Sequence, residues 1–289
     1  MSPAEGTTLC FPDGEKSCFA CCPPIRPAGY EHGRYETMVK RVLRENTRAY
    51  RAEEREVRPI TGFSCWALGY LDPDCRLVGC LLHPARHGGK DLRFRVDFGE
   101  KCRRETCPEA DVFDRLEPEA RWFWLRLADG LDAFAYSSRL RNPLFRFLKW
   151  GPTVLRRIQR DAQGRDPCHS AASLERAYPI LASPLAPRGW AYPVERLCAL
   201  GGTGLLRKAE TAGSLERGLR SLILRIRRER TVPGPADAPH THRLPLERPF
   251  LDFLRLTAGI HRLPYEDART LKALVDEAVE RISGTPPAP

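Results

Sequence analysis

The sequence predicts a mainly α-helical protein with little β-structure, in which one irregular, loop-dominated module is rich in cysteine. Nine of the 11 cysteines lie within the first 107 of the 289 residues, where Gly, Pro and Asp punctuate the chain. The remainder contains long stretches with apolar side chains at helical spacing. Hydrophobic residues make up 42% of the chain and charged residues 29%, so the composition favours a folded protein over a disordered one.

Two segments of the cysteine-rich part carry a periodic signal. Residues 35–54 contain neither Gly nor Pro and place Met38, Val42 and Leu43 on one side, which predicts a helix. Residues 91–99 alternate apolar with charged side chains, which predicts a half-buried strand. The segments FPDG, CCPPIRP and LDPDC, which contain or adjoin cysteines, are rich in turn-forming residues, so we expect them to be loops.

The rest of the chain contains three segments that predict helices. Residues 117–129 begin with a first-turn proline and stop before a glycine. Residues 264–283 carry apolar side chains every three or four positions, which predicts a helix that faces a core. Residues 214–230 combine an apolar face with a basic one, whose members are Arg217, Arg220, Arg225, Arg227, Arg228 and Arg230.

The step in cysteine content places a predicted domain boundary near residue 110. Residues 1–110 would form the cysteine-rich metal-binding module, and residues 111–289 a basic helical domain with a proline-rich connection at 231–249 and a frayed tail. The first region holds 18 Lys and Arg against 16 Asp and Glu, which leaves 29 against 21 of the chain's 47 and 37 for the second. This excess of positive charge fits an acidic protein partner or an anionic membrane surface. Nucleic acid is the less favoured partner, because an arginine bias of this kind can reflect a GC-rich genome.

The sequence gives no sign of export or membrane insertion. It opens without a basic stretch followed by an apolar run, and no segment offers the roughly 18 uninterrupted apolar residues that span a bilayer. We therefore expect a cytoplasmic protein without a transmembrane segment. Because thiols stay reduced in the cytosol, a cysteine-dense stretch there is more typical of metal binding or catalysis than of disulfides.

The cysteine spacing indicates metal binding. Two residues separate Cys18 from Cys21, and a tight turn lets such a pair converge on one ion. Cys22 follows directly, and adjacent side chains on an extended backbone point in opposite directions. We therefore expect Cys21 and Cys22 to ligate different metal atoms, which favours an iron–sulfur cluster over a single zinc ion. The candidate ligands are Cys10, Cys18, Cys21, Cys22, Cys65, Cys75, Cys80, Cys102 and Cys107, together with His83.

This arrangement resembles the YkgJ-type cysteine-cluster family, which is described as zinc- or iron-chelating. The matching residues are Cys18, Cys21 and Cys22 for the end of the family's CxxCxxCC-like run, Cys65 and Cys75 for its middle pair, His83-Pro84 where it often has Arg-Pro, and Cys102-Arg103 for its final pair. The resemblance covers about residues 10–107 and none of the helical remainder. The first cysteine of the run is displaced to Cys10, and Cys80 and Cys107 are additional.

Three functions are open at this point. The first is an iron–sulfur protein, with a cluster of the 4Fe-4S type that transfers electrons or clamps distant loops into one fold. The second is a zinc-stabilised binding module whose basic helical domain recruits an acidic partner or nucleic acid. The third, which the resemblance implies, is a cluster-containing modification enzyme similar to flagellin lysine N-methylases. The sequence assigns no catalytic residue to it.

Overall fold

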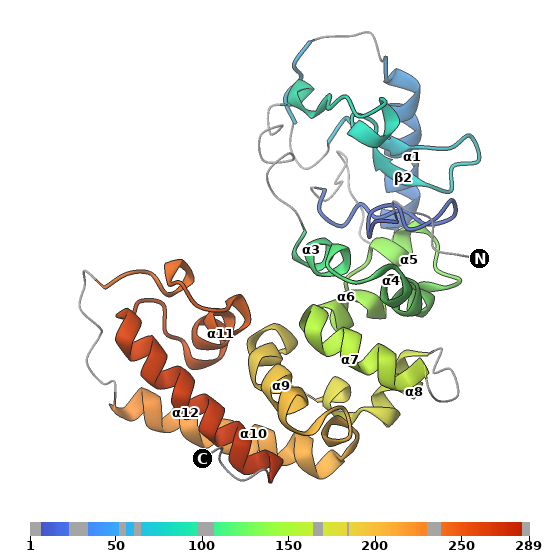
Figure 1. Cartoon of the computed structure of the whole chain (residues 1–289). Coiled ribbons are helices and arrows are strands. Elements are labelled where there is room, and N and C mark those ends of the chain that lie inside the picture. Colours follow the sequence, from blue (N-terminus) through green and yellow to red (C-terminus); the bar gives the residue numbers. More distant parts are fainter. Residues whose placement is uncertain are drawn as a thin grey trace. The chain divides into compact units, whose positions relative to one another are not determined.

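The computed structural model describes residues 7–22, 34–51, 56–60, 65–96, 107–163, 170–183, 185–229 and 238–284. The chain divides into two compact units, Met1–Pro143 and Leu144–Pro289 (Figure 1). Within the described residues the chain is mainly helical with little β-structure, as the sequence predicts, and its strands form one short hairpin that the sequence did not predict. Each of these described helices is too short or too polar to cross a membrane.

The first unit combines one long helix, a hairpin and several short helices. Its elements are α1 (Tyr35–Ala49), β1 (Leu68–Tyr70), β2 (Val78–Cys80), the 3-10 helices η2 (Pro84–Arg86) and η3 (Arg93–Arg95), α3 (Pro108–Asp114), α4 (Pro118–Leu125), the 3-10 helix η4 (Arg126–Ala128) and α5 (Ala133–Ser137). The helices predicted at 35–54 and 117–129 are confirmed as α1 and as α4 with η4. Residues 52–54 of the first prediction lie outside the described residues.

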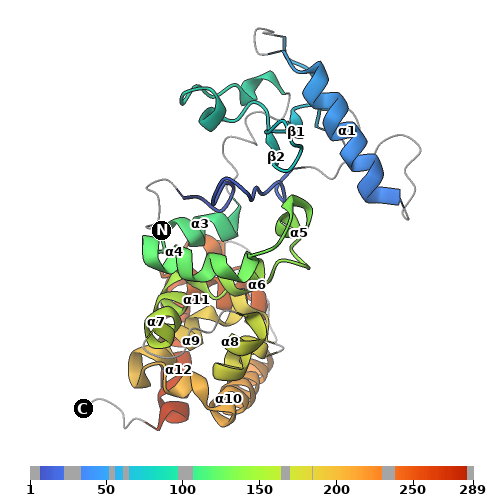
Figure 2. The same cartoon turned by 90° about the vertical axis from the view of Figure 1, so that its right-hand side faces the viewer.

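The core of the first unit forms where α1 packs against the hairpin (Figure 2). β1 and β2 are antiparallel, with Leu68 opposite Cys80. The side-chain amide of Asn46 in α1 donates to the carbonyl of Leu68 at 2.9 Å, and the hydroxyl of Thr47 accepts the N–H of Tyr70 at 2.7 Å. A Cβ at Gly69 would lie 2.6 Å from that hydroxyl, so this approach of helix and strand requires glycine.

The prediction of a strand at 91–99 is wrong for residues 91–96, the part of this segment that the structure describes. Residues 93–95 form the 3-10 helix η3, and Val96 makes only an isolated bridge with Arg58. The carboxylate of Asp91 accepts the backbone N–H of Arg93 at 3.0 Å, which stabilises a local turn in competition with a strand. As a result Phe94, which the alternation assigns to the core, is 58% exposed. Residues 97–99 lie outside the described residues.

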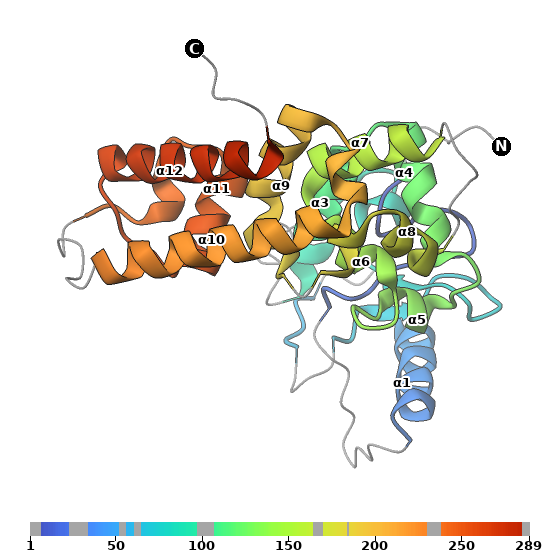
Figure 3. The ribbon, with the colours of Figure 1, turned by 90° about the horizontal axis from the view of Figure 1, so that it is seen from below.

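The second unit is helical throughout its described residues. Its elements are α6 (Pro143–Leu148), α7 (Gly151–Gln163), α8 (Ala171–Ala177), η5 (Pro179–Ala182), α9 (Pro187–Gly201), η6 (Leu205–Arg207), α10 (Ala209–Glu229), η7 (Thr241–Arg243), α11 (Arg248–Asp252), the π-helix η8 (Phe253–Ala258) and α12 (Tyr265–Ser283). α9 packs against α7, α11, η8 and α12, while α10 and α12 run side by side (Figure 3).

The periodic segments of the second unit behave as predicted. The segments at 214–230 and 264–283 are confirmed as α10 and α12, although α10 begins five residues earlier, at Ala209. The apolar stripe of each helix is buried, and burying one such side chain contributes about 1.5–3 kcal/mol. The buried members are Leu215, Leu219, Leu222, Ile223 and Ile226 in α10, and Leu271, Val275, Ala278 and Val279 in α12. The tail at 285–289 and residues 230–237 lie outside the described residues.

Candidate metal centre

The segment at residues 7–22, which carries four cysteines, lies between the hairpin and α5 (Figures 1 and 2). On one side, the hydroxyl of Ser17 accepts the N–H of Val78 in β2 at 2.8 Å. On the other side, the hydroxyl of Ser137 in α5 accepts the N–H of Phe19 at 3.0 Å and donates to the carbonyl of Ser17 at 3.4 Å. Both serines are buried, so these bonds fix the segment against its two neighbours.

Further hydrogen bonds shape the backbone around the thiols. The hydroxyl of Tyr136 in α5 donates to the carbonyl of Leu9 at 3.0 Å. The N–H of Cys18 donates to the carbonyl of Cys10 at 2.9 Å, which closes a loop and brings these two cysteines together. The N–H of Cys22 donates to the carbonyl of Phe19 at 3.0 Å, so Cys21 and Cys22 lie at a turn.

Four thiols share one partly buried neighbourhood, which we call the Cys10 group. Burial raises the pKa of Cys10 to about 12, and the charges of Cys21 and Cys107 add to the effect. Burial likewise raises the pKa of Cys18 to about 12, with further contributions from Cys10, Cys21 and Cys107. The pKa values of Cys10 and Cys18 both respond to the charges of Cys21 and Cys107, so these four thiols lie in one part of the first unit. The Cys10 group consists of Cys10, Cys18, Cys21 and Cys107.

A second set of thiols gathers on the hairpin side, and we call it the Cys22 group. The pKa of Cys22 is raised first by its hydrogen bond with Cys21 and then by burial, and the charges of Cys80 and Cys65 raise it further. Cys65 precedes β1 and Cys80 ends β2. All three side chains belong to or pack against the apolar core of the first unit. The Cys22 group consists of Cys22, Cys65 and Cys80.

Adjacent cysteines therefore take part in different groups. The thiol of Cys22 donates a hydrogen bond to Cys21, which lowers the pKa of Cys21 to about 6, and the positive charges of Arg139 and Arg93 assist. Cys21 is exposed, whereas Cys22 packs against the core. Cys21 is thus the thiolate of the pair at neutral pH and Cys22 the proton donor.

Cys107 completes the Cys10 group from the far end of the cysteine-rich region. It caps α3, and its Sγ lies 3.0 Å from Oε2 of Glu109, to which the thiol donates. The guanidinium of Arg139 donates to Oε1 of Glu109 at 2.9 Å and to the Cys107 sulfur at 3.5 Å. The side chain of Glu109 is only 6% exposed, so this ion pair stabilises a carboxylate that would otherwise be buried without a partner.

The remaining predicted ligands lie elsewhere or outside the described residues. Cys75 sits in the hairpin loop at a φ of 58°, with its Sγ 3.9 Å from the carbonyl of Pro73. The ring of His83 lies 6.1 Å from that of Phe11, and its pKa is lowered by burial and by Arg93. Cys102 lies outside the described residues. Among the residues that are described, no three His, Cys, Asp or Glu side chains have the arrangement of a closed metal site.

The donor set of the Cys10 group nevertheless fits a soft metal ion or cluster. Four ligands is the usual number for structural zinc and for iron–sulfur clusters, and both accept thiolates as ligands. One backbone donor is already aimed at a sulfur, since the N–H of Ala20 lies 3.5 Å from the Cys18 Sγ. Such donors stabilise a thiolate, so the group would hold a zinc ion or a cluster without new polar partners for Cys18.

Two residues of this site were not predicted from the sequence. Glu109 follows Cys107 by two positions, and a charged residue in the first turn of a helix is ordinarily solvated. Arg139 lies 32 positions from Cys107 and beyond the predicted boundary at residue 110. The sequence offers no signal for their pairing, because it depends on how α5 and the following residues fold back onto α3.

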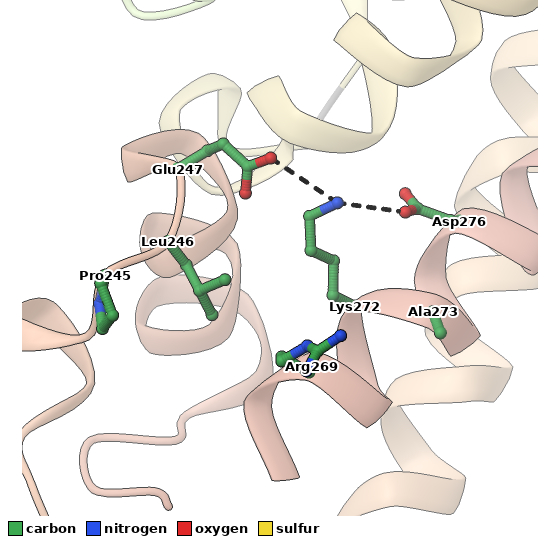
Figure 4. A pocket seen from close by; sticks show the side chains of 7 residues that line it. All are labelled: Pro245, Leu246, Glu247, Arg269, Lys272, Ala273 and Asp276. Carbon is green, nitrogen blue, oxygen red and sulfur yellow. Dashed lines mark hydrogen bonds and ion pairs between the residues drawn. The ribbon is translucent and has the colours of Figure 1, made fainter. Parts of the chain in front are cut away.

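The second unit contains one notable hollow among its described residues, with a volume of about 610 Å³. It is an open groove between α12 and the residues before α11, and Lys272 lies at its centre (Figure 4). Nζ of Lys272 lies 3.6 Å from Glu247 and 3.3 Å from Asp276. These charges neutralise one another, so the groove gives no specific support for a methyl-donor site. Its lining residues are Pro245, Leu246, Glu247, Arg269, Lys272, Ala273 and Asp276.

Cys198, the described cysteine beyond residue 110, lies apart from the candidate metal centre. Cys198 is completely buried in α9, and burial raises its pKa to about 12, as expected for a thiol that only packs the core. Cys168 lies outside the described residues.

Comparison with known proteins adds no relative to this picture. No family model matches the chain, and no match was found among curated proteins or among solved structures.

Proposed function

We propose that this protein binds metal through its N-terminal thiols, with the Cys10 group as one centre and the Cys22 group as part of a second. The observation that carries the proposal is the hydrogen-bonded loop that brings Cys10 and Cys18 together, with Cys21 at the turn that follows. Cys107 is bonded to Arg139, whose charge also acts on Cys21. The Cys22 group holds three thiols, and Cys75 or Cys102 is its candidate fourth ligand.

The bound group that we propose is an iron–sulfur cluster, with zinc as the alternative. A cluster held by four thiolates would supply one-electron chemistry at the Cys10 group, whereas zinc would supply no redox chemistry. In either case the chain's own residues bind and orient the metal, and Ser17, Ser137 and Tyr136 hold the ligand-bearing segment in place. Ligation would join residues 10–22 to residue 107 and so contribute to folding.

Metal analysis of the full-length protein tests this proposal. The protein would be purified without oxygen, and its iron, sulfide and zinc measured together with its visible absorption. Brown protein with iron and sulfide supports the cluster, and colourless protein with stoichiometric zinc supports the zinc-stabilised module. Protein without bound metal after reconstitution with either would overturn the proposal.

Single substitutions separate the two groups. Cys18→Ser removes a ligand of the Cys10 group, and Cys65→Ser removes one of the Cys22 group. If the groups are separate centres, each variant keeps part of the metal, and the double variant keeps none. Cys198→Ala is the matched control, because this thiol lies in the core of the second unit. Loss of all metal from either single variant would instead indicate one shared centre.

A further inference from the structure

Arg139 hydrogen-bonds both to a sulfur of the Cys10 group and to a buried carboxylate. One arm of its guanidinium is 2.9 Å from Glu109 and the other is 3.5 Å from the Cys107 sulfur. Its charge also acts on Cys21, a second member of the group. The Arg139 side chain is 46% exposed, whereas that of Glu109 is 6% exposed, so the buried carboxylate anchors a guanidinium that reaches in from the surface.

The charge of the site explains why such a cation matters. Four thiolates around a zinc ion, or around a 4Fe-4S cluster, leave an excess of negative charge. The carboxylate of Glu109, 3.0 Å from the Cys107 sulfur, adds to that excess. A thiolate and a carboxylate so close together repel each other unless a cation lies between them or beside both. Arg139 already bonds to both groups, so it occupies that position.

We propose that Arg139 is a positioning residue of the metal centre, whose guanidinium is held by buried Glu109 and donates a hydrogen bond to the Cys107 sulfur when that sulfur binds metal. This inference rests on the proposed function and adds to it the residue that compensates the charge of the site. Arginine suits the task because its planar fork can serve two acceptors at once, which the single ammonium of lysine does less well.

Zn²⁺ affinity of the full chain, measured by competition with a chromophoric chelator, tests the inference. The variants are Arg139→Gln, which removes the charge, and Arg139→Lys, which keeps the charge but not the fork. Arg141→Gln is the matched control, because Arg141 is an exposed neighbour on the same stretch. We expect Arg139→Gln to bind Zn²⁺ about 10- to 100-fold more weakly, the range typical for residues that orient metal ligands. The Zn²⁺ affinity of Arg139→Lys should lie between those of Arg139→Gln and the native protein, and the affinity of Arg141→Gln should equal the native one.

A second readout distinguishes positioning from a merely structural role. With Co²⁺ in place of Zn²⁺, the sulfur-to-metal absorption reports how many thiolates are bound. Arg139→Gln should reduce this absorption in protein whose far-UV circular dichroism is unchanged, because Cys107 binds less firmly. Native affinity and native Co²⁺ absorption in Arg139→Gln would overturn this inference and leave the proposed function standing. A native protein that binds neither Zn²⁺ nor Co²⁺, and that also takes up no iron and sulfide on reconstitution, would overturn both.

Discussion

Cys21 differs from its neighbours because it is held as a thiolate. The hydrogen bond from Cys22 lowers its pKa to about 6, while burial raises the pKa values of Cys10 and Cys18 to about 12. Since the thiolate is the reactive form, Cys21 should dominate the thiol chemistry of protein from which metal has been removed.

We predict that iodoacetamide modifies Cys21 first in metal-free protein. The rate should rise as the pH increases through about 6 and level off near neutral pH, because the group whose pKa is lowered is already deprotonated there. Mass spectrometry of peptides at a series of pH values measures this. Cys198 should react only after unfolding, because it is buried and its pKa is raised to about 12.

The control for this prediction is Cys22→Ala, which removes the hydrogen bond to Cys21. In this variant, the pH at which the rate of Cys21 modification levels off should be higher. An unchanged profile would mean that Cys22 is not the proton donor of the pair.

Ser137 is the second residue whose substitution we expect to have a measurable effect, in this case on stability. We predict that Ser137→Ala lowers the free energy of unfolding of the first unit by about 1–3 kcal/mol, because the N–H of Phe19 loses its acceptor in a half-buried place. Urea unfolding followed by circular dichroism measures the change. The neighbouring Ser138→Ala is the control. The hydroxyl of Ser138 accepts an exposed N–H, from Arg141, so its removal should lower the free energy of unfolding much less.

At this scale the sequence predicted a set of candidate ligands but not which of them meet. The adjacency of Cys21 and Cys22 predicted that they serve different metal atoms, and this stays a prediction; in the structure the two thiols hydrogen-bond to each other. The sequence could not predict that Glu109 and Arg139 pair, because their pairing comes from tertiary contacts.

At the scale of elements, helices with a strong apolar stripe were predictable and short elements were not. α12 was predicted almost to the residue because its stripe and the glycine after it are local signals. The hairpin was missed because each strand has three residues, with a glycine at the centre of both. The false strand at 91–99 arose because Asp91 bonds to the backbone of Arg93, an effect that alternation of side chains does not reveal.

One carboxylate of α12 makes several polar contacts that include α9. Asp276 accepts a hydrogen bond from the hydroxyl of Tyr192 at 2.5 Å and forms ion pairs with Arg196 at 3.0 Å and Lys272 at 3.3 Å. We predict that Asp276→Asn lowers the free energy of unfolding of the second unit by about 1–3 kcal/mol, because several charge-assisted bonds weaken together. Urea unfolding measures this.

The adjacent Glu277→Gln is the matched control for Asp276→Asn. Glu277 is exposed and lies 3.8 Å from Arg281 on the same helix, an arrangement that contributes little. An equal decrease of the free energy of unfolding in the two variants would contradict the assignment of Asp276 as a residue that stabilises the contact between these helices.

At the scale of the whole molecule, the change in cysteine content along the chain marked the cysteine-rich region but not the end of the compact unit that contains it. The step in cysteine content lies near residue 110, whereas the first compact unit ends at Pro143. The additional residues include α5, whose Tyr136 and Ser137 bind the segment at 7–22. Composition cannot reveal such a partnership, because α5 contains no cysteine.

We predict that removal of metal loosens the first unit and leaves the second intact. Hydrogen exchange measured on peptides after chelation should accelerate at residues 7–22 and 65–80, where ligation would otherwise hold the chain. Exchange in α9 and α12 should stay unchanged, because their cores contain no proposed ligand. Equal acceleration in both units would count against a metal centre confined to the first.

The bond between Tyr136 and Leu9 joins residues that are 127 positions apart, and this has a consequence for biosynthesis. At roughly 5–20 residues per second, translation needs on the order of 6 to 25 s to reach Tyr136 after Leu9 has been made. During that interval the nascent N-terminal thiols have no α5 to dock against. Loading of the proposed centre would therefore follow delivery of the middle of the chain by the ribosome.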